Sequence, residues 1–291
     1  MKCAWEALIQ IIPPRLRGEV DRLGKETLQE LRFRQGQPVE MVMNKNSICL
    51  KTEAGSEDIA YIVSMASRYS PWAAVTASKG YITARGGHRI GVCGDVVLKS
   101  GEVAGIRVPY SLCIRVARDF PGIGKGVERL SGNLLILGPP GCGKTTLLRD
   151  IIRQKSNAGS GCIAVVDERG ELFPMLESGS PFPKGLHTDI ITGCDKASGI
   201  DMVLRTMGPE WIAVDEITAE RDCRAIEQAG WCGVGILATA HAADVTDLIC
   251  RPVYRHLAAS GLFRQALVLT RDKSWRLEEI PCCTSSGLVH C

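Results

Sequence analysis

Four residues, Gly138, Gly143, Lys144 and Thr145, fit the pattern G-x-x-x-x-G-K-[ST] in the stretch GPPGCGKT. Glycines let the backbone curl so that successive N–H groups face one point, and a helix that begins there adds its positive dipole end. The lysine would reach the β- and γ-phosphates of a nucleotide, and the threonine hydroxyl would ligate Mg²⁺. The sequence therefore predicts a nucleotide-phosphate site made by Gly138, Pro139, Pro140, Gly141, Cys142, Gly143, Lys144, Thr145 and Thr146.

Cys142 lies inside this loop, between two of its glycines. Backbone amides and the neighbouring lysine would make its thiol more reactive than an ordinary one. Two interpretations stay open: a redox-sensitive loop, or a small residue without chemistry of its own.

A pair of carboxylates follows the apolar stretch WIAV. Asp215 and Glu216 come directly after these strand-like residues, and ligands of an open parallel sheet bind at the carboxyl ends of its strands. Asp215 would hold Mg²⁺, directly or through a water, and Glu216 would orient or deprotonate the attacking water. A strand that ends in Asp-Glu favours an enzyme that hydrolyses its nucleotide over a slow nucleotide-dependent switch protein.

Two further apolar stretches end in polar residues. CIAVV is followed by Asp167, Glu168 and Glu171, and it comes next after the helix of the phosphate loop. The end of this strand should lie near the same edge of the sheet, so Asp167 is a further candidate metal ligand and Glu168 a candidate catalytic residue. GILAT leads through Thr239 to His241. The histidine would contact the γ-phosphate and report its loss, or would be an ordinary surface residue; both interpretations stay open.

The elements that must position these residues fall into two halves. Before residue 119, LRFRQGQPVEMVM and GYITARGGHRIGVCGDVVL predict hairpins, the second turning at Gly86-Gly87, while NKN (44–46) predicts a turn and EDIAYIVSMASRYS a helix. After residue 131, LLIL, CIAVV, WIAV and GILAT alternate with helical stretches. Continuous apolar strands of this kind predict a mostly parallel sheet with both faces covered.

We therefore expect an α/β fold: a P-loop NTPase domain of RecA/AAA-like type, preceded by a smaller α+β N-terminal domain for docking and oligomer contacts. The expected boundaries are 1–118 for the N-terminal domain, 119–131 for a linker, 132–281 for the ATPase domain and 282–291 for a flexible tail. The tail, CCTSSGLVHC, is also a candidate soft-metal site through Cys282, Cys283, His290 and Cys291, although its spacing matches no standard zinc pattern.

Composition narrows the class of protein. Hydrophobic residues make up 45% and charged residues 23% of 291 residues, which favours a globular protein over a disordered chain or a coiled coil. Thirteen scattered cysteines, an odd number, predict reduced thiols in a cytoplasmic protein. No stretch of eighteen apolar residues runs without a charge, so any membrane association should be peripheral, through a partner.

Taken together, GPPGCGKT, VVDERGE, DEI and ATAHA resemble the Walker A loop, Asp box, Walker B glutamate and His box of the secretion-superfamily ATPases, which drive type II and type IV secretion and pilus motors. RTMGPEWIAVDE is similar to the family's segment before the glutamate. The resemblance covers residues 119 to 280 and, more loosely, the N-terminal half. It implies ATP as substrate, Mg²⁺ as cofactor, a hexamer, and docking on membrane proteins of a channel complex that the hydrolysis powers or assembles.

The chain departs from that family at two positions of the second motif. Asp215 stands where the secretion motors usually have glycine, and Thr218 where they have arginine. The first departure makes the metal site more like that of a general AAA-type ATPase. The tetracysteine insertion of some type II motors is absent from the sequence.

Hexamers of the family complete each site with arginines of a neighbouring subunit, which stabilise charge on the transferring phosphoryl group. The resemblance therefore implies an arginine finger in this chain, and ARGGHRIG is the preferred source, through Arg85 or Arg89 as catalytic residues. The other candidates are Arg107, Arg115, Arg118 and, within the ATPase half, Arg205.

Two other classes of P-loop protein remain as alternatives. A nucleic-acid-stimulated ATPase, such as a helicase or loader, would use tryptophans for base stacking, and the chain has Trp5, Trp72, Trp211, Trp231 and Trp275. However, no basic run interleaved with aromatic residues is present and the net charge is only +3, so nucleic acid is not an expected partner. A small-molecule kinase would need a substrate lid, for which no segment is evident.

Overall fold

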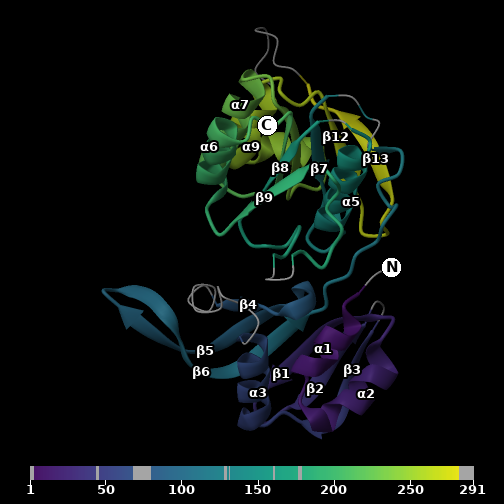
Figure 1. Ribbon diagram of the computed structural model, residues 1–291, viewed down its shortest axis with the longest axis vertical. Helices are drawn as coiled ribbons and strands as arrows, with labels where there is room; N and C mark the ends of the chain where they lie inside the picture. Colours follow the sequence, from purple (N-terminus) through teal and green to yellow (C-terminus); the bar gives the residue numbers. More distant parts are fainter. Residues whose placement is uncertain are drawn as a thin grey trace. The chain divides into compact units, whose positions relative to one another are not determined.

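The computed structural model describes residues 3–43, 46–67, 80–127, 130, 132–159, 161–175 and 179–281. The chain forms two compact units (Figure 1). The first comprises Met1–Asp119 and Pro174–Phe182, and the second Phe120–Phe173 and Pro183–Cys291. A short segment from the middle of the chain is thus part of the N-terminal unit, and most of the expected linker is part of the second.

The first unit is built on a six-stranded antiparallel sheet in the order β3-β2-β1-β6-β5-β4. Leu8 and Ile59 from helices and Leu31, Phe33 and Ile114 from strands share one buried core, because each strand presents alternate apolar residues to the same face. The elements are α1 (Trp5–Ile11), α2 (Pro14–Gly24), β1 (Leu28–Arg34), β2 (Pro38–Met43), β3 (Ser47–Glu53), α3 (Ser56–Ser67), β4 (Tyr81–Thr83), η1 (Arg85–Gly87), β5 (Arg89–Lys99) and β6 (Glu102–Arg115).

The predicted hairpins and helix of this unit are present. β1 pairs with β2, and β4 with β5, both antiparallel. The second connection turns at Gly86 (φ +85°) and Gly87 (φ +79°), a backbone conformation that favours glycine. A Cβ on Gly86 would also lie 2.6 Å from the Ala4 Cβ. Residues 44–45, 68–70 and Trp72 lie outside the described residues.

His88 follows this turn and is completely buried. Its Nδ1 accepts a hydrogen bond from the Ala117 N–H at 3.1 Å, and its Nε2–H donates to the Ala4 carbonyl at 3.0 Å. Burial disfavours the imidazolium ion and lowers the pKa of His88 to about 4. The His88 side chain therefore connects the N-terminal segment to the residues that follow β6.

β5 and β6 continue as a two-stranded ribbon that extends beyond the other strands of the unit (Figure 1). The ribbon turns at Ser100 and Gly101, both with positive φ. Its outer part exposes Val96, Leu98 and Val103, because no third strand or helix covers a ribbon of two strands.

The second unit contains a seven-stranded sheet in the order β13-β12-β7-β11-β10-β8-β9. All neighbours in it are parallel except β12 and β13. The elements are β7 (Leu134–Leu137), α5 (Lys144–Asn157), β8 (Ile163–Asp167), β9 (Thr188–Thr192), α6 (Lys196–Thr206), β10 (Trp211–Ile217), α7 (Glu220–Trp231), β11 (Gly235–Ala240), α8 (Val245–Cys250), α9 (Pro252–Ala259), β12 (Gln265–Leu269) and β13 (Trp275–Glu279).

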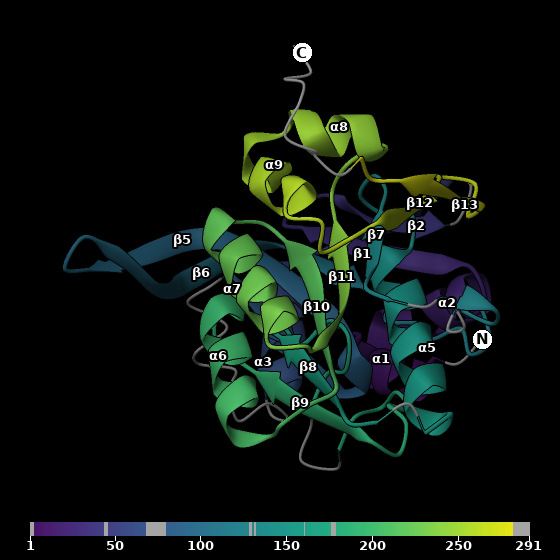
Figure 2. The same cartoon turned by 90° about the horizontal axis from the view of Figure 1, so that it is seen from above.

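Helices cover both faces of this sheet. α6, α7 and α9 share one core with the strands through Ile200, Ile226 and Leu257, and α5 lies on the opposite face (Figure 2). LLIL, CIAVV, WIAV and GILAT form the central strands, so the predicted α/β class with a mostly parallel P-loop sheet is confirmed.

Asp150 of α5 ties the phosphate-loop helix to the segment that enters the second unit. Its carboxylate accepts N–H donors from Gly122 and Gly124, the latter at 2.7 Å, and pairs with Arg153 and Gln154. Burial acts to raise the pKa of Asp150, but the backbone and side-chain donors outweigh it and hold the pKa below its usual range.

Within the described residues, no helix is long and apolar enough to cross a bilayer. The tail, including Cys282, Cys283, His290 and Cys291, lies outside the described residues.

Candidate functional site

The stretch GPPGCGK joins the end of β7 to the start of α5. Gly138, Gly141 and Gly143 all have positive φ, of 152°, 75° and 105°. A Cβ on Gly138 would lie 2.4 Å from the carbonyl oxygen of Leu269 and 2.7 Å from the Cys142 Sγ. No side chain caps α5, so the N–H groups at its first turn remain available to an anion.

Lys144, the first residue of α5, is only 6% exposed. Its Nζ donates to the carbonyls of Gly138 at 2.8 Å and Pro139 at 3.0 Å, and lies 2.9 Å from the His241 Nδ1. Burial lowers the pKa of Lys144 because the charged form loses hydration. The ammonium group is therefore held inside the loop, at the position where phosphate charge would be neutralised.

Asp215 and Glu216 lie at a β-bulge within β10, between Val214 and Ile217, rather than after the end of the strand. Glu216 has φ +52°, which is uncommon for a residue with a side chain. A bulge re-aims successive side chains, and here the Asp215 carboxylate contacts Thr145 while the Glu216 carboxylate contacts His241.

Thr239 of β11 connects the acidic pair. Its hydroxyl donates to the Asp215 Oδ1 at 2.7 Å and accepts the N–H of Glu216 at 2.8 Å. The other Asp215 oxygen accepts the Thr145 hydroxyl at 2.7 Å. One buried threonine thus holds the Asp215 carboxylate and the Glu216 backbone of the bulge beside α5.

His241 bridges Lys144 and Glu216. Its Nε2 lies 3.1 Å from the Glu216 Oε1, and since the lysine can only donate to Nδ1, the proton of the neutral imidazole lies on Nε2. The second Glu216 oxygen accepts from Arg169 Nη1 at 3.4 Å. The glutamate therefore has one donor on each oxygen.

The end of β8 adds more charged groups to the same edge of the sheet. Asp167 accepts the N–H groups of Glu171 and Phe173, each at 2.8 Å, and burial raises its pKa to about 7. Glu168 accepts from the buried Lys196 at 2.5 Å. A small cavity there is lined by Asp167, Glu168, Arg169, Glu171, Lys196, Asp215 and Glu216.

The residues predicted from the second half of the sequence therefore converge. Hydrogen bonds join Lys144 to His241, His241 to Glu216, and Thr145 to Asp215, and Thr239 connects the two groups. Asp167 and Glu168 line the adjoining cavity. The individual roles predicted for them remain predictions.

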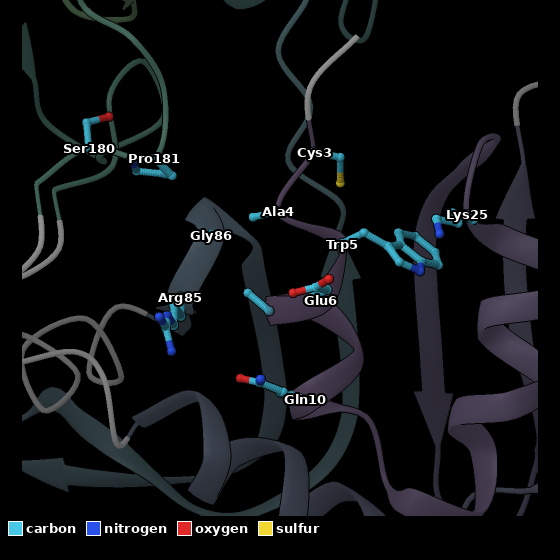
Figure 3. A pocket seen from close by; sticks show the side chains of 11 residues that line it. Cys3, Ala4, Trp5, Glu6, Gln10, Lys25, Arg85, Gly86, Ser180 and Pro181 are labelled. Carbon is cyan, nitrogen blue, oxygen red and sulfur yellow. The ribbon is translucent and has the colours of Figure 1, made fainter.

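The candidate arginine fingers make their described contacts with residues other than those of this site. In the first unit, Arg85 lines a cavity of about 450 Å³ with Trp5 and Lys25 (Figure 3), and Arg89 stacks 4.3 Å from the centroid of the Tyr81 ring. The others have contacts inside their own unit: Arg107 with Asp95, Arg115 with Glu30, Arg118 with the Leu28 carbonyl, and Arg205 with Asp201.

Three cations at the site, Arg169, Lys196 and Lys273, were not among the predicted site residues. Arg169 is adjacent to Glu168 in the sequence, which is a weak signal for its position. Lys196 begins α6, and Lys273 lies in the turn after β12. Nothing in the local sequence distinguishes these two from surface lysines.

The oxygen atoms present fit Mg²⁺ together with a nucleotide. The Thr145 hydroxyl and an Asp215 oxygen lie 2.7 Å apart beside the phosphate loop, and Mg²⁺ prefers one or two carboxylates plus substrate phosphates to a dedicated protein cage. Among the described residues, no group of three or more His, Cys, Asp or Glu side chains could hold a metal alone. Thr145 and Asp215 would be the protein ligands.

Solved structures of two ATPases share this fold. The ATPase DotB of Yersinia pseudotuberculosis superposes with a TM-score of 0.57 at 17% identity, over 89% of this chain and 76% of that one. The pilus retraction motor PilT with bound ADP superposes with a TM-score of 0.58 at 14% identity, over 87% and 76%. An antiparallel N-terminal sheet followed by a mostly parallel P-loop sheet is therefore the fold that this chain shares with DotB and PilT.

A sequence relative is closer than these structures. Stage III sporulation protein AA of Bacillus subtilis (strain 168) is 33% identical over 279 residues, which is 91% of each chain. Residues 5–278 match the family described as Sporulation stage III, protein AA. The chain belongs to that family of sporulation proteins, and its fold is that of the ATPase DotB and the pilus retraction motor PilT.

Proposed function

We propose that the chain is a Mg²⁺-dependent ATPase that hydrolyses ATP to ADP and phosphate. It works as an oligomer, in which six subunits form the ring, and powers or assembles a membrane channel complex during endospore formation, between mother cell and forespore. The observation that carries the proposal is the hydrogen-bonded series from the phosphate loop to the bulge: Lys144 to His241, His241 to Glu216, and Thr145 to Asp215.

Nucleotide binding is assigned to the phosphate loop. Positive φ at its glycines lets backbone N–H groups converge. When nucleotide binds, the Lys144 ammonium group gives up its hydrogen bonds to the carbonyls of Gly138 and Pro139 and donates to phosphate oxygens instead. Desolvation of this lysine favours the exchange, because a partly dehydrated cation gains more from an anion than from neutral carbonyls. Mg²⁺ would supply charge neutralisation on the phosphates, with Thr145 and Asp215 as its protein ligands.

Hydrolysis is assigned to Glu216, which takes a proton from the attacking water. Its two oxygens are held by His241 and Arg169, so the carboxylate has a defined orientation before substrate binds. His241 also contacts Lys144. When the lysine moves toward phosphate, the hydrogen bond between Lys144 Nζ and His241 Nδ1 is therefore lost. His241 can thereby report the state of the phosphates to the acidic pair.

Assembly and partners are supported by the family relation. A sporulation protein with the fold of secretion motors is expected to act in the cytoplasm and to reach the membrane through membrane proteins of the same complex. An arginine from a neighbouring subunit would complete each site, and Arg85 and Arg89 are the first candidates. Arg85→Ala or Arg89→Ala should bind ATP normally but lose assembly-dependent hydrolysis; normal hydrolysis by both variants would remove the assignment.

The test of the activity is the variant Glu216→Gln. It should bind Mg-ATP with nearly the affinity of the wild type and hydrolyse it at least about a hundredfold more slowly, since the base is lost while the phosphate site is kept. Glu220→Gln is the matched control, because Glu220 is an exposed acid paired with Arg224 at the start of α7. Equal hydrolysis by wild type and Glu216→Gln would refute the proposal.

The same variant tests the partners. Held in its ATP-bound form, Glu216→Gln should retain integral membrane proteins of the sporulating cell in a pull-down. Recovery of nucleic acid alone, together with hydrolysis stimulated by single-stranded DNA and strongly dependent on salt, would replace the proposal by a nucleic-acid-dependent ATPase.

A further inference from the structure

A lysine from the opposite end of the second unit's sequence contacts the outside of the phosphate loop. Lys273 lies in the turn between β12 and β13, and its Nζ donates to the carbonyl oxygens of Gly141 at 3.0 Å and Cys142 at 3.1 Å. β12 pairs with β7 in parallel, so the turn after β12 and the loop after β7 emerge at the same edge of the sheet.

The turn holds Lys273 in place through its own hydrogen bonds. Thr270 Oγ1 donates to the Ser274 carbonyl at 2.9 Å, and Ser274 Oγ donates to the Asp272 Oδ1 at 3.0 Å. Lys273 itself has φ +72°, a conformation that costs a residue with a Cβ roughly 1–2 kcal/mol. A lysine that is held in a strained backbone conformation, with both of its contacts on one loop, indicates a specific role at that loop.

The contact determines which way two peptide units of the loop face. In a trans peptide the carbonyl and the next N–H point in opposite directions. Lys273 binds the carbonyls of Gly141 and Cys142 from outside the loop, so the N–H groups of Cys142 and Gly143 are turned to the inside. The Cys142 N–H indeed faces the Pro139 carbonyl, at 3.4 Å, which is also the carbonyl that Lys144 binds.

We propose that Lys273 is a positioning residue for the nucleotide phosphates: it clamps the outer carbonyls of the phosphate loop so that the Cys142 and Gly143 amides stay directed at the bound phosphate. The assignment rests on the proposed nucleotide site. The clamp acts on amides that every polyphosphate ligand uses, so it strengthens binding of ATP, ADP and inorganic pyrophosphate by a similar factor.

The experiment compares four full-length proteins: wild type, Lys273→Met, Lys273→Arg and Arg271→Met. Arg271 is an exposed cation in the same turn, so its variant removes one positive charge from this turn while Lys273 keeps its contacts with the carbonyls. Calorimetry measures the affinity for Mg-ATP, Mg-ADP and Mg-pyrophosphate, and steady-state assays give KM and kcat.

Lys273→Met should lower the affinity for all three ligands by roughly tenfold, as expected for loss of charge-assisted hydrogen bonds at a partly exposed site. Its KM should rise by about the same factor with kcat nearly unchanged, because the clamp acts equally on bound substrate and transition state. Lys273→Arg should restore most of the affinity, since a guanidinium can also donate to two carbonyls, and Arg271→Met should bind as the wild type does.

Three results would overturn the assignment while leaving the proposed function intact: wild-type affinities in Lys273→Met, a loss confined to ATP, which indicates direct contact with the γ-phosphate, or an equal loss in Arg271→Met, which indicates a general charge effect. Failure of the wild type to bind any of the three ligands would instead refute the nucleotide site itself.

Discussion

Replacing Thr239 by valine tests whether one buried hydroxyl holds the acidic pair in its working geometry. The valine side chain has nearly the same shape as that of threonine, but it neither donates nor accepts hydrogen bonds. The substitution therefore removes the donor to Asp215 and leaves the N–H of Glu216 without its acceptor. Thr239 has no exposed surface, so water cannot replace the hydroxyl without a rearrangement.

The expected cost follows from the two bonds. A hydrogen bond to a charged group contributes about 1.5–3 kcal/mol, and a buried N–H without a partner costs about 1–3 kcal/mol. Because the bulge at Glu216 can relax and recover part of this loss, we expect Thr239→Val to lower the free energy of unfolding by about 2–4 kcal/mol. Displacement of the Asp215 carboxylate and of the Glu216 backbone should also lower kcat by roughly 10- to 100-fold, equivalent to about 1.4–2.7 kcal/mol in the barrier.

Urea unfolding and steady-state ATP hydrolysis measure the two effects, with Thr239→Ser as the control that keeps the hydroxyl. The serine variant should keep most of the activity and lose only the methyl packing. If Thr239→Val hydrolyses ATP like Thr239→Ser, the hydroxyl does not organise the acidic pair, and the reasoning is wrong.

Three further predictions concern the supports of the site and of the first unit. Asp150→Ala should lower the free energy of unfolding by at least about 3 kcal/mol in urea titrations, since it removes the buried carboxylate that accepts hydrogen bonds from Arg153 and from two glycine N–H groups; a loss under 1 kcal/mol would show that these bonds do not stabilise the fold. Gly138→Ala should abolish measurable ATP binding, because its Cβ would collide with the Leu269 carbonyl, whereas Gly141→Ala, with nothing within 4 Å of its Cβ, should cost only about 1–2 kcal/mol of backbone strain; equal affinities in a calorimetric comparison would contradict this. For His88, burial lowers the pKa from 6.5 to about 4. Between these values the unfolded chain binds a proton that the folded chain does not, so stability should fall by up to about 3 kcal/mol as the pH drops through this window. His88→Gln should lose that acid dependence in urea melts at pH 7 and 4.5, and an unchanged dependence would assign it to other groups.

The glycine-rich turn between β7 and α5 and the class of the fold could be predicted from sequence because both depend on local pattern. Two glycines and a lysine at this fixed spacing are typical of a phosphate-binding turn, and continuous apolar strands between helices predict a sheet covered on both faces. The gathering of the carboxylates after these strands at one edge of the sheet was also predictable, since parallel strands deliver their carboxyl ends to the same edge. Even so, the bulge that turns Asp215 and Glu216 toward Thr145 and Thr239 has no signal in WIAVDEI.

What the sequence determined by itself is therefore the chemistry available: a phosphate loop, two pairs of carboxylates and a histidine on adjacent strands. Only the tertiary structure decided how these groups are held. The Thr239 hydroxyl meets a carboxylate 24 residues away, and Lys273 meets carbonyls 132 and 131 residues away. Such contacts depend on strand order and register, which are set by the packing of the whole sheet rather than by any local run of residues.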